Sequence, residues 1–200
     1  LFANEGYVTA ISAWHDGGHF SEDKMIQAVY RPVDFLKKEV SEKARFSKVV
    51  AIGHSFGAQR LMKAALKDNE NRFSAVVLIQ PPDSLKKYIR NHPYIYHLSR
   101  EPTTRKMMLR YIKLMERSLN VRTVDDQQRL LDYIDNDKSL TELIRSNRAA
   151  VPPSFFLFSK NDSHISYMDS VNACDLLCRN GHLSEAKELL GLHKHISIGE

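Results

Sequence analysis

The stretch Val49–Gly57, VVAIGHSFG, joins a short apolar run to a serine with a glycine two positions before and after it. The apolar residues predict a β-strand, and the residues that follow have the pattern of a helix. Gly-x-Ser-x-Gly at a strand-to-helix turn is typical of a nucleophile elbow. Because that turn is tight, we expect a side chain at position 53 or 57 to collide with its neighbours. An ordinary glycine turn is the alternative.

The composition is that of a globular domain with one sizeable core. Of the 200 residues, 42% are hydrophobic and 26% charged, and no long uncharged apolar run predicts a membrane span. The two cysteines, Cys174 and Cys178, are interpreted as free thiols, which favours a reducing, cytoplasmic location. The chain begins with Leu1, so we expect the native start, and any targeting signal, to lie upstream.

Short apolar runs alternate with helical patterns, which predicts an α/β fold with a mostly parallel sheet flanked by helices and buried on both faces. The predicted strands are residues 7–13, 48–52, 75–79, 154–158 and 185–192. The predicted helices between them are residues 22–40 with a kink at Pro32, 56–66 and 167–177. We assign residues 1–82 and 151–200 to this core.

Residues 83–150 differ in character and predict a helical cap, or lid, inserted before the strand at 154–158. The predicted cap helices are residues 84–98, 103–119, 124–134 and 138–148. Residues 84–122 contain ten lysines and arginines against two glutamates. This excess could attract an anionic group of a substrate or an anionic membrane surface, with a solvated helix face as the alternative. No nucleic-acid-binding motif accompanies it, so no nucleic acid is expected as a partner.

A serine hydroxyl becomes an effective nucleophile when a base accepts its proton and an acid orients that base. The elbow supplies Ser55 as the nucleophile and the backbone N–H of Phe56 as an oxyanion-hole donor. Asp162 follows an apolar strand and fits the acid, with a helix N-cap as the alternative. His195 is preferred as the base over His193, because an apolar residue follows it and the preceding turn gives it room.

Further residues are candidates for substrate binding. His54 adjoins the nucleophile and His164 lies close to the acid in the sequence. An apolar stripe at helical spacing on the insertion could line an acyl pocket, although such a stripe is also compatible with core packing. Its candidate residues are Met108, Tyr111 and Met115. The histidines complete no metal-ligand set, so neither a metal nor another cofactor is expected.

The GHSFG turn after VVAI, Asp162 after SFFLFSKN and the late histidine together resemble the α/β-hydrolase-fold serine hydrolases, which include esterases, lipases and thioesterases. The resemblance covers essentially all 200 residues, and the helical insertion lies where this family carries its cap. It implies cleavage of a small-molecule carboxylic ester or thioester through an acyl-enzyme. A non-catalytic hydrolase-fold module that binds its ligand through the basic insertion is the alternative.

The resemblance also implies that the N-terminal strands of the family are missing. If residues 7–13 match the fourth strand, the third strand would lie between them and residues 48–52, in the middle of the sheet. A sheet without that strand would leave backbone groups unpaired. We therefore expect the sequence to be part of a longer protein, with the second oxyanion donor located upstream of Leu1.

Overall fold

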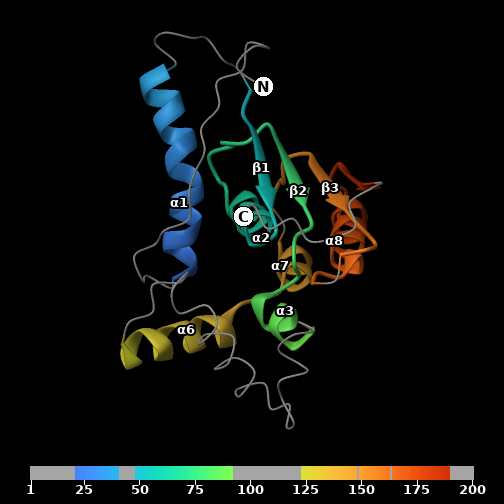
Figure 1. Ribbon diagram of the computed structural model, residues 1–200. Helices are drawn as coiled ribbons and strands as arrows, with labels where there is room; N and C mark the ends of the chain where they lie inside the picture. The colour runs from blue at the N-terminus through green and yellow to red at the C-terminus, as the bar shows by residue number, and fades with distance from the viewer. Residues whose placement is uncertain (1–20, 41–47, 92–122, 148, 163, 190–200) are drawn as a thin grey trace.

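The computed structural model describes residues 21–40, 48–91, 123–147, 149–162 and 164–189 (Figure 1). Within these ranges the strands form one parallel sheet in the order β1-β2-β3-β4. The strands are β1 (Val50–His54), β2 (Ala75–Ile79), β3 (Ser154–Phe158) and β4 (Ser184–Glu188). Because all pairs are parallel, the carboxyl ends of the strands lie at the same end of the sheet. The chain thus has the α/β architecture that the sequence predicts.

The predicted bounds of β2 and β3 are confirmed, whereas β1 lies two residues later than predicted. β1 extends through Gly53 and His54 because their backbones pair with Leu78 and Ile79 of β2. The apolar run in the sequence ends earlier, since backbone pairing does not require an apolar side chain. β4, with the sequence SEAKE, ends at Glu188. It is the last strand of the described sheet and carries charged side chains, as is common at sheet edges.

α2 (Phe56–Leu66) and α8 (Tyr167–Arg179) pack on this sheet, and α1 (Glu22–Phe35) packs on α2. The predicted bounds of α2 are confirmed, and α8 extends two residues beyond its predicted end. The helix predicted over residues 22–40 is α-helical to Phe35 and continues as a π-helical segment, Leu36–Val40. Pro32 lies inside α1, where its ring nitrogen cannot donate a backbone hydrogen bond.

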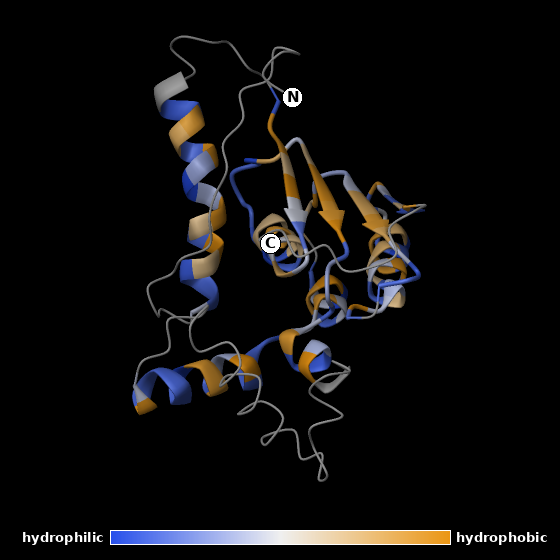
Figure 2. Ribbon diagram, in the orientation of Figure 1, coloured by the Kyte–Doolittle hydropathy of each residue, from blue (hydrophilic) through white to orange (hydrophobic). Residues whose placement is uncertain are grey.

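The core lies between one face of the sheet and the helices. α2 packs on β1 and β2, α8 packs on β3 and β4, and α1 packs on α2. Leu78 and Phe156 are fully buried in this layer, and Figure 2 shows the apolar character of the central strands. On the other face of β1, Val50 and Ile52 are 56% and 58% exposed. Within the described residues, β1 is therefore buried on one face, whereas the sequence predicted burial on both faces.

The described part of the predicted cap consists of α3 (Leu85–Asn91), α6 (Val124–Asn136) and α7 (Leu140–Ser146). α3 contacts α6, and both lie beyond the carboxyl ends of the strands in Figure 1. α7 packs against α2 and α8 and buries Leu140 and Ile144 in the core. The last helix of the predicted insertion thus belongs to the layer on the sheet. Within the described ranges, no helix combines the length and apolar composition needed to cross a bilayer.

Candidate active site

Ser55 occupies the turn between β1 and α2 in a strained backbone conformation, with φ 54° and ψ −126°. A positive φ is uncommon for a residue with a side chain. Backbone hydrogen bonds hold the turn: the Ser55 N–H donates to the Ile79 carbonyl at 2.8 Å, and the Ser55 carbonyl accepts from the Ala58 and Gln59 N–H groups. Ser55 is also the N-cap residue of α2, yet its hydroxyl makes no capping hydrogen bond.

The two glycines of the motif have different surroundings. A Cβ atom on Gly53 would lie 2.6 Å from the Ala58 Cα and 2.7 Å from the Gly57 carbonyl oxygen, too close for any side chain. A Cβ atom on Gly57 would meet no heavy atom within 4 Å. The expected collision is therefore confirmed at position 53 and wrong at position 57. The reason is that Gly53 faces the first turn of α2, whereas Gly57 is exposed to solvent.

Asp162 lies in the loop between β3 and α8, and its carboxylate is held by that loop. Its Oδ1 accepts hydrogen bonds from the N–H groups of His164 at 2.7 Å and Ile165 at 3.0 Å. This is a local Asx-type turn. α8 begins at Tyr167 with Ser166 as its N-cap residue, so Asp162 does not serve as the cap of that helix. The alternative role of Asp162, as a helix N-cap, is therefore wrong.

A buried glutamine that the sequence analysis did not single out connects this acid loop to β2. Gln80 follows β2 at φ 50° and is 4% exposed. Its Oε1 accepts from the Ser159 N–H at 2.7 Å, and its Nε2 donates to the Ile165 carbonyl at 3.0 Å. One side chain thus holds both ends of the loop that carries Asp162. The only sequence signal was a polar residue between an apolar strand and two prolines.

Tyr88 of α3 is a second residue that the sequence analysis missed. Its ring packs edge-on against the ring of Phe56, with 4.9 Å between the centroids and 81° between the planes. Phe56 directly follows Ser55 in the chain. Burial, and to a smaller extent the negative charge of Asp162, raise the pKa of Tyr88 to about 12. The hydroxyl of Tyr88 therefore stays protonated at neutral pH and can donate a hydrogen bond.

The strand order brings the candidate nucleophile and acid to one end of the sheet. Ser55 follows β1 and Asp162 follows β3, with β2 between them. Neighbouring strands lie about 4.8 Å apart, so the ends of β1 and β3 are separated by roughly 10 Å. An imidazole ring with a hydrogen bond on each side spans a distance of this order. Directly after β4, the Leu189 N–H donates to the Phe158 carbonyl at 2.7 Å, which places this end of β4 beside the end of β3.

The structure places some of the remaining predicted site residues. His54 is the last residue of β1 and His164 lies in the acid loop, both half-buried. Phe56 is the first residue of α2. The other predicted residues lie outside the described part of the chain, namely His193, His195, Met108, Tyr111 and Met115.

Of the basic side chains in residues 84–122, the structure describes those of two lysines. Lys86 forms an ion pair with Asp135 of α6 at 3.1 Å, and Lys87 forms one with Asp169 of α8 at 2.5 Å. These pairs connect α3 to its neighbours, so this part of the positive charge has a structural role.

Both cysteines lie in the described ranges. Cys174 and Cys178 are free thiols, and burial raises the pKa of Cys174. In those ranges, no three His, Cys, Asp or Glu side chains are grouped so that they could hold a metal ion.

No protein-family model matches the sequence, and no curated protein matches it. Solved structures are similar. Prolyl oligopeptidase B from Galerina marginata aligns at TM-score 0.57 and 19% identity, over 90% of this chain and 23% of that one. An esterase from Pyrococcus furiosus aligns at TM-score 0.53 and 18% identity, over 86% and 54%. Candida antarctica lipase A aligns at TM-score 0.52 and 13% identity, over 89% and 51%.

These three proteins share the α/β-hydrolase fold, and this chain has that fold as well, as the sequence resemblance implied. At identities below 20%, the likeness concerns the fold. The chain spans between 23% and 54% of the length of these structures.

Proposed function

We propose that this chain carries the catalytic centre of a serine hydrolase that cleaves a carboxylic ester or thioester, with Ser55 as the nucleophile. The observation that carries the proposal is the strained turn at Ser55, combined with the absence of a capping bond from its hydroxyl. An ordinary strand-to-helix link needs no strain, and a serine at the N-cap position normally caps its helix. Strain of this kind persists where the surrounding structure maintains it, and it is concentrated at functional sites.

In the proposed mechanism, His195 accepts the proton of the Ser55 hydroxyl as its oxygen attacks the acyl carbon, with His193 as the alternative base. Asp162 orients the imidazole and stabilises its protonated form. The carbonyl oxygen becomes negative and accepts a hydrogen bond from the Phe56 N–H. The C–O or C–S bond then breaks, and the histidine protonates the leaving group. Water, deprotonated by the same histidine, releases the acid and regenerates Ser55.

The described geometry supports this arrangement of nucleophile and acid. Both lie at the carboxyl ends of parallel strands, where ligands bind in open α/β sheets. The Asp162 carboxylate is oriented by two backbone N–H groups, and Gln80 holds the loop around it. An acid whose position is fixed before the substrate binds can orient a histidine without further rearrangement. The proposed substrate is a small-molecule acyl compound. We further propose that the basic cap attracts an anionic group of this substrate or an anionic membrane surface.

The test is hydrolysis of p-nitrophenyl esters from acetyl to decanoyl, and of acyl-CoA thioesters, by the full chain and by variants. We expect Ser55→Ala to lower kcat at least about 10³-fold, and Asp162→Asn about 10²- to 10⁴-fold. Ser146→Ala is the matched control, because Ser146 lies at the exposed end of α7. Turnover by Ser55→Ala at the rate of the unchanged protein would contradict the proposal.

A further inference from the structure

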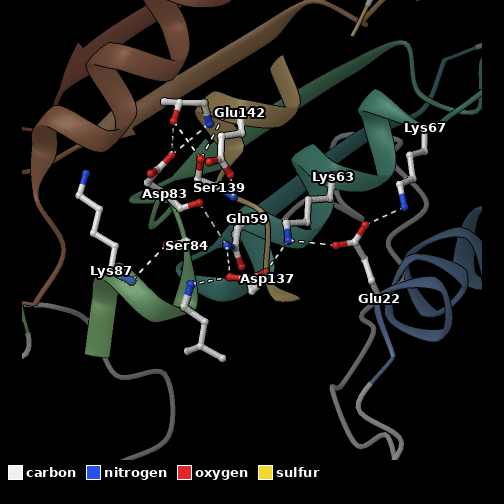
Figure 3. A network of polar contacts seen from close by, with 12 residues as sticks. Glu22, Gln59, Lys63, Lys67, Asp83, Ser84, Lys87, Asp137, Ser139 and Glu142 are labelled. Atoms are coloured by element: carbon white, nitrogen blue, oxygen red, sulfur yellow. Dashed lines mark hydrogen bonds and ion pairs between the residues drawn. The ribbon is translucent and has the colours of Figure 1, made fainter. Parts of the chain in front are cut away.

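Two aspartates at the base of the insertion each bind the first turn of the helix that follows the other. Asp83 lies just before α3, and its Oδ1 accepts from the N–H and the hydroxyl of Thr141 in α7, both at 3.0 Å. Asp137 lies just before α7, and its Oδ2 accepts from the N–H of Leu85, the first residue of α3, at 2.6 Å (Figure 3). Carboxylates stabilise helix N-termini in this way. We call these contacts the reciprocal clasp.

The reciprocal clasp is joined to α2 as well. The Asp137 side chain is fully buried, and its Oδ1 contacts the Lys63 ammonium at 2.5 Å. Gln59 Nε2 donates to the Asp137 Oδ2 and to the Asp83 carbonyl, each at 3.4 Å (Figure 3). Lys63 and Gln59 both belong to α2. The reciprocal clasp therefore holds α3 and α7 against a helix of the core.

α8 is held beside α3 and α7 by contacts at both of its ends. In its first turn, the buried Asp169 accepts from the Asp83 N–H at 3.0 Å through Oδ2, and its Oδ1 contacts the Lys87 ammonium of α3. Just after its last residue, the Asn180 Nδ2 donates to the Ile144 carbonyl of α7 at 2.9 Å. The relative positions of α3, α7 and α8 are thus fixed by side-chain hydrogen bonds.

A cavity of about 270 Å³ lies between these three helices. Its inner wall consists of groups that already have partners: the buried Asp169 pairs with Lys87, and the buried Asp83 accepts from Thr141. The volume is just below the range of about 300–1,000 Å³ that is common for small-molecule pockets. The cavity therefore has room for a small metabolite beside a wall whose charges are already paired.

Two arginines line the outer end of this cavity. Arg145 lies in the last turn of α7, and Arg179 is the last residue of α8. They directly follow and precede Ile144 and Asn180, whose hydrogen bond joins these two helix ends, so both arginines belong to the same end of the cavity. Among the described residues, neither arginine has a carboxylate partner. Two guanidinium groups placed in this way can bind one carboxylate together.

An unpaired carboxylate lies one helical turn before Arg179. Asp175 also lines the cavity, and four residues along a helix span about 6 Å. Within the described ranges Asp175 forms no ion pair, although the i,i+4 spacing to an arginine often permits one. The exposed amide of Asn172 lines the cavity nearer to the inner wall. Beyond the groups that are already paired, the cavity thus offers two positive charges and, one turn away, one negative charge.

This distribution of charge favours a ligand that carries both signs. A simple anion at the arginines would be repelled by Asp175 and by the negative ends of the two helix dipoles. A simple cation at Asp175 would be repelled by the two guanidinium groups. In a free α-amino acid, the ammonium and carboxylate groups are attached to the same carbon atom, which suits charges that lie one helical turn apart. Each charge of such a ligand would therefore meet a partner of the opposite sign.

We propose that this cavity binds a free α-amino acid with a polar side chain. Arg145 and Arg179 hold its carboxylate, Asp175 accepts from its ammonium group, and the Asn172 amide contacts its side chain, which extends toward the inner wall. The proposed site shares no residue with the serine hydrolase centre. The inference therefore goes beyond the proposed function and does not depend on it.

The test is a titration of the full chain with L-serine, L-asparagine and L-glutamine, followed by the ¹H–¹⁵N NMR resonances. We expect saturable shifts of N–H groups in α7 and α8 with at least one of the three. The α-amide and the N-acetyl derivative of that amino acid lack the carboxylate and the ammonium charge, and each should bind at least about 10-fold more weakly. If none of the three amino acids gives a saturable shift up to about 50 mM, the inference is overturned.

Variants assign the binding to the cavity. Arg145→Gln and Arg179→Gln should each raise the Kd at least about 10-fold, because a charge-assisted hydrogen bond is lost. Asp175→Asn should weaken binding of the amino acid but not of its N-acetyl derivative, which has no ammonium group. Equal weakening of both ligands by Asp175→Asn overturns the role of that residue.

Arg129→Gln is the matched control. Arg129 is an exposed arginine of α6 that has no described partner and does not line the cavity. Its removal should leave the Kd unchanged. If Arg145 and Arg179 served only the dipoles of their helices, their removal would lower the unfolding midpoint and leave the Kd unchanged, which overturns the inference.

Ser55→Ala separates this site from the proposed catalytic centre. The variant should bind the amino acid with an unchanged Kd and with the same shifted resonances. Loss of binding in Ser55→Ala would place the ligand at the nucleophile elbow and overturn the inference. Binding that persists in a chain without esterase activity contradicts the proposed function alone.

Discussion

The nucleophile elbow and the reciprocal clasp both contact α2, but they are built in different ways. The elbow consists of neighbouring residues and is held by backbone hydrogen bonds and by the lack of a side chain at Gly53. The clasp joins segments more than fifty residues apart and depends on buried carboxylates and an ammonium group. Ser55 is thus positioned by residues close to it in the sequence, whereas α3 is positioned by residues far from it in the sequence.

The two regions should also fail in different ways when they are altered. Added volume at the elbow has no room, so the cost is steric. Loss of the Lys63 charge leaves the Asp137 carboxylate buried without its ammonium partner, so the cost is electrostatic. The first two predictions below each pair a variant with a control that keeps the chemistry and changes the surroundings.

The largest effect is expected at the buried ion pair of the clasp. Lys63→Met leaves the fully buried Asp137 carboxylate without its ammonium partner, which should lower the free energy of unfolding by about 3–5 kcal/mol. Urea denaturation followed by circular dichroism measures this change. The control is Lys67→Met, since Lys67 is 43% exposed and pairs with Glu22 at 2.7 Å. Lys67→Met should lower the free energy of unfolding by no more than about 1 kcal/mol. Equal losses in both variants would contradict the distinction between a buried and an exposed ion pair.

The second prediction concerns the two glycines of the elbow. Gly53→Ala places a methyl group 2.6 Å from the Ala58 Cα, so we expect a loss of about 1–3 kcal/mol in stability and slower labelling of Ser55. Gly57→Ala adds a methyl group to open space in a helix, and should gain about 0.5–1 kcal/mol. Thermal unfolding of both variants measures the difference. A Gly57→Ala variant as unstable as Gly53→Ala would show that the space around Gly57 is not open.

The third prediction tests the support of the acid loop by Gln80. Gln80→Met keeps the size of the side chain but leaves the Ser159 N–H and the Ile165 carbonyl without their partner. We expect a loss of about 1–3 kcal/mol in stability. Because the loop carries Asp162, kcat should fall while KM changes little. Steady-state kinetics with a p-nitrophenyl ester checks this, and a variant with unchanged kcat would show that the loop holds Asp162 without Gln80.

The smallest effect is expected at Glu22, where α1 meets the lysines of α2. Burial opposes ionisation, but hydrogen bonds and charges from Lys67 and Lys63 outweigh it and lower the pKa of Glu22 below 4.5. A group with a lowered pKa in the folded state stabilises the protein above its unfolded pKa, and this contribution is lost as the pH falls through the folded value. Glu22→Gln should therefore be less stable than the unchanged protein at pH 7 and approach it below about pH 4. A difference in unfolding midpoint that is constant from pH 7 to pH 3 would contradict this.

The sequence was sufficient to predict features that depend on local pattern. The bounds of β2, β3 and α2, and the turn at Ser55, follow from apolar runs and glycine spacing within a few residues. Asp162 could be placed after β3 for the same reason. Crowding at Gly57 was predicted in error, because the sequence does not show which side of the first helical turn faces solvent.

Features that depend on tertiary contacts could not be predicted from the sequence. Gln80 holds a loop about eighty residues away, and the Lys63–Asp137 pair spans 74 positions. A buried lysine inside a helical pattern reads as a surface residue until its partner is known. Tyr88 was one aromatic residue among several in the insertion, and only the fold shows that it packs on Phe56. The roles of His195, His193, Met108, Tyr111 and Met115 stay predictions.

The most direct measurement is to locate the adduct formed with a fluorophosphonate by digestion with trypsin and mass spectrometry. Ser55 lies in the tryptic peptide Val49–Arg60, VVAIGHSFGAQR, which contains no other hydroxyl side chain. If Ser55 is the activated nucleophile, the mass of the bound phosphonyl group appears on this peptide and disappears in Ser55→Ala. An adduct on another peptide, or labelling that persists in Ser55→Ala, would contradict the assignment of Ser55.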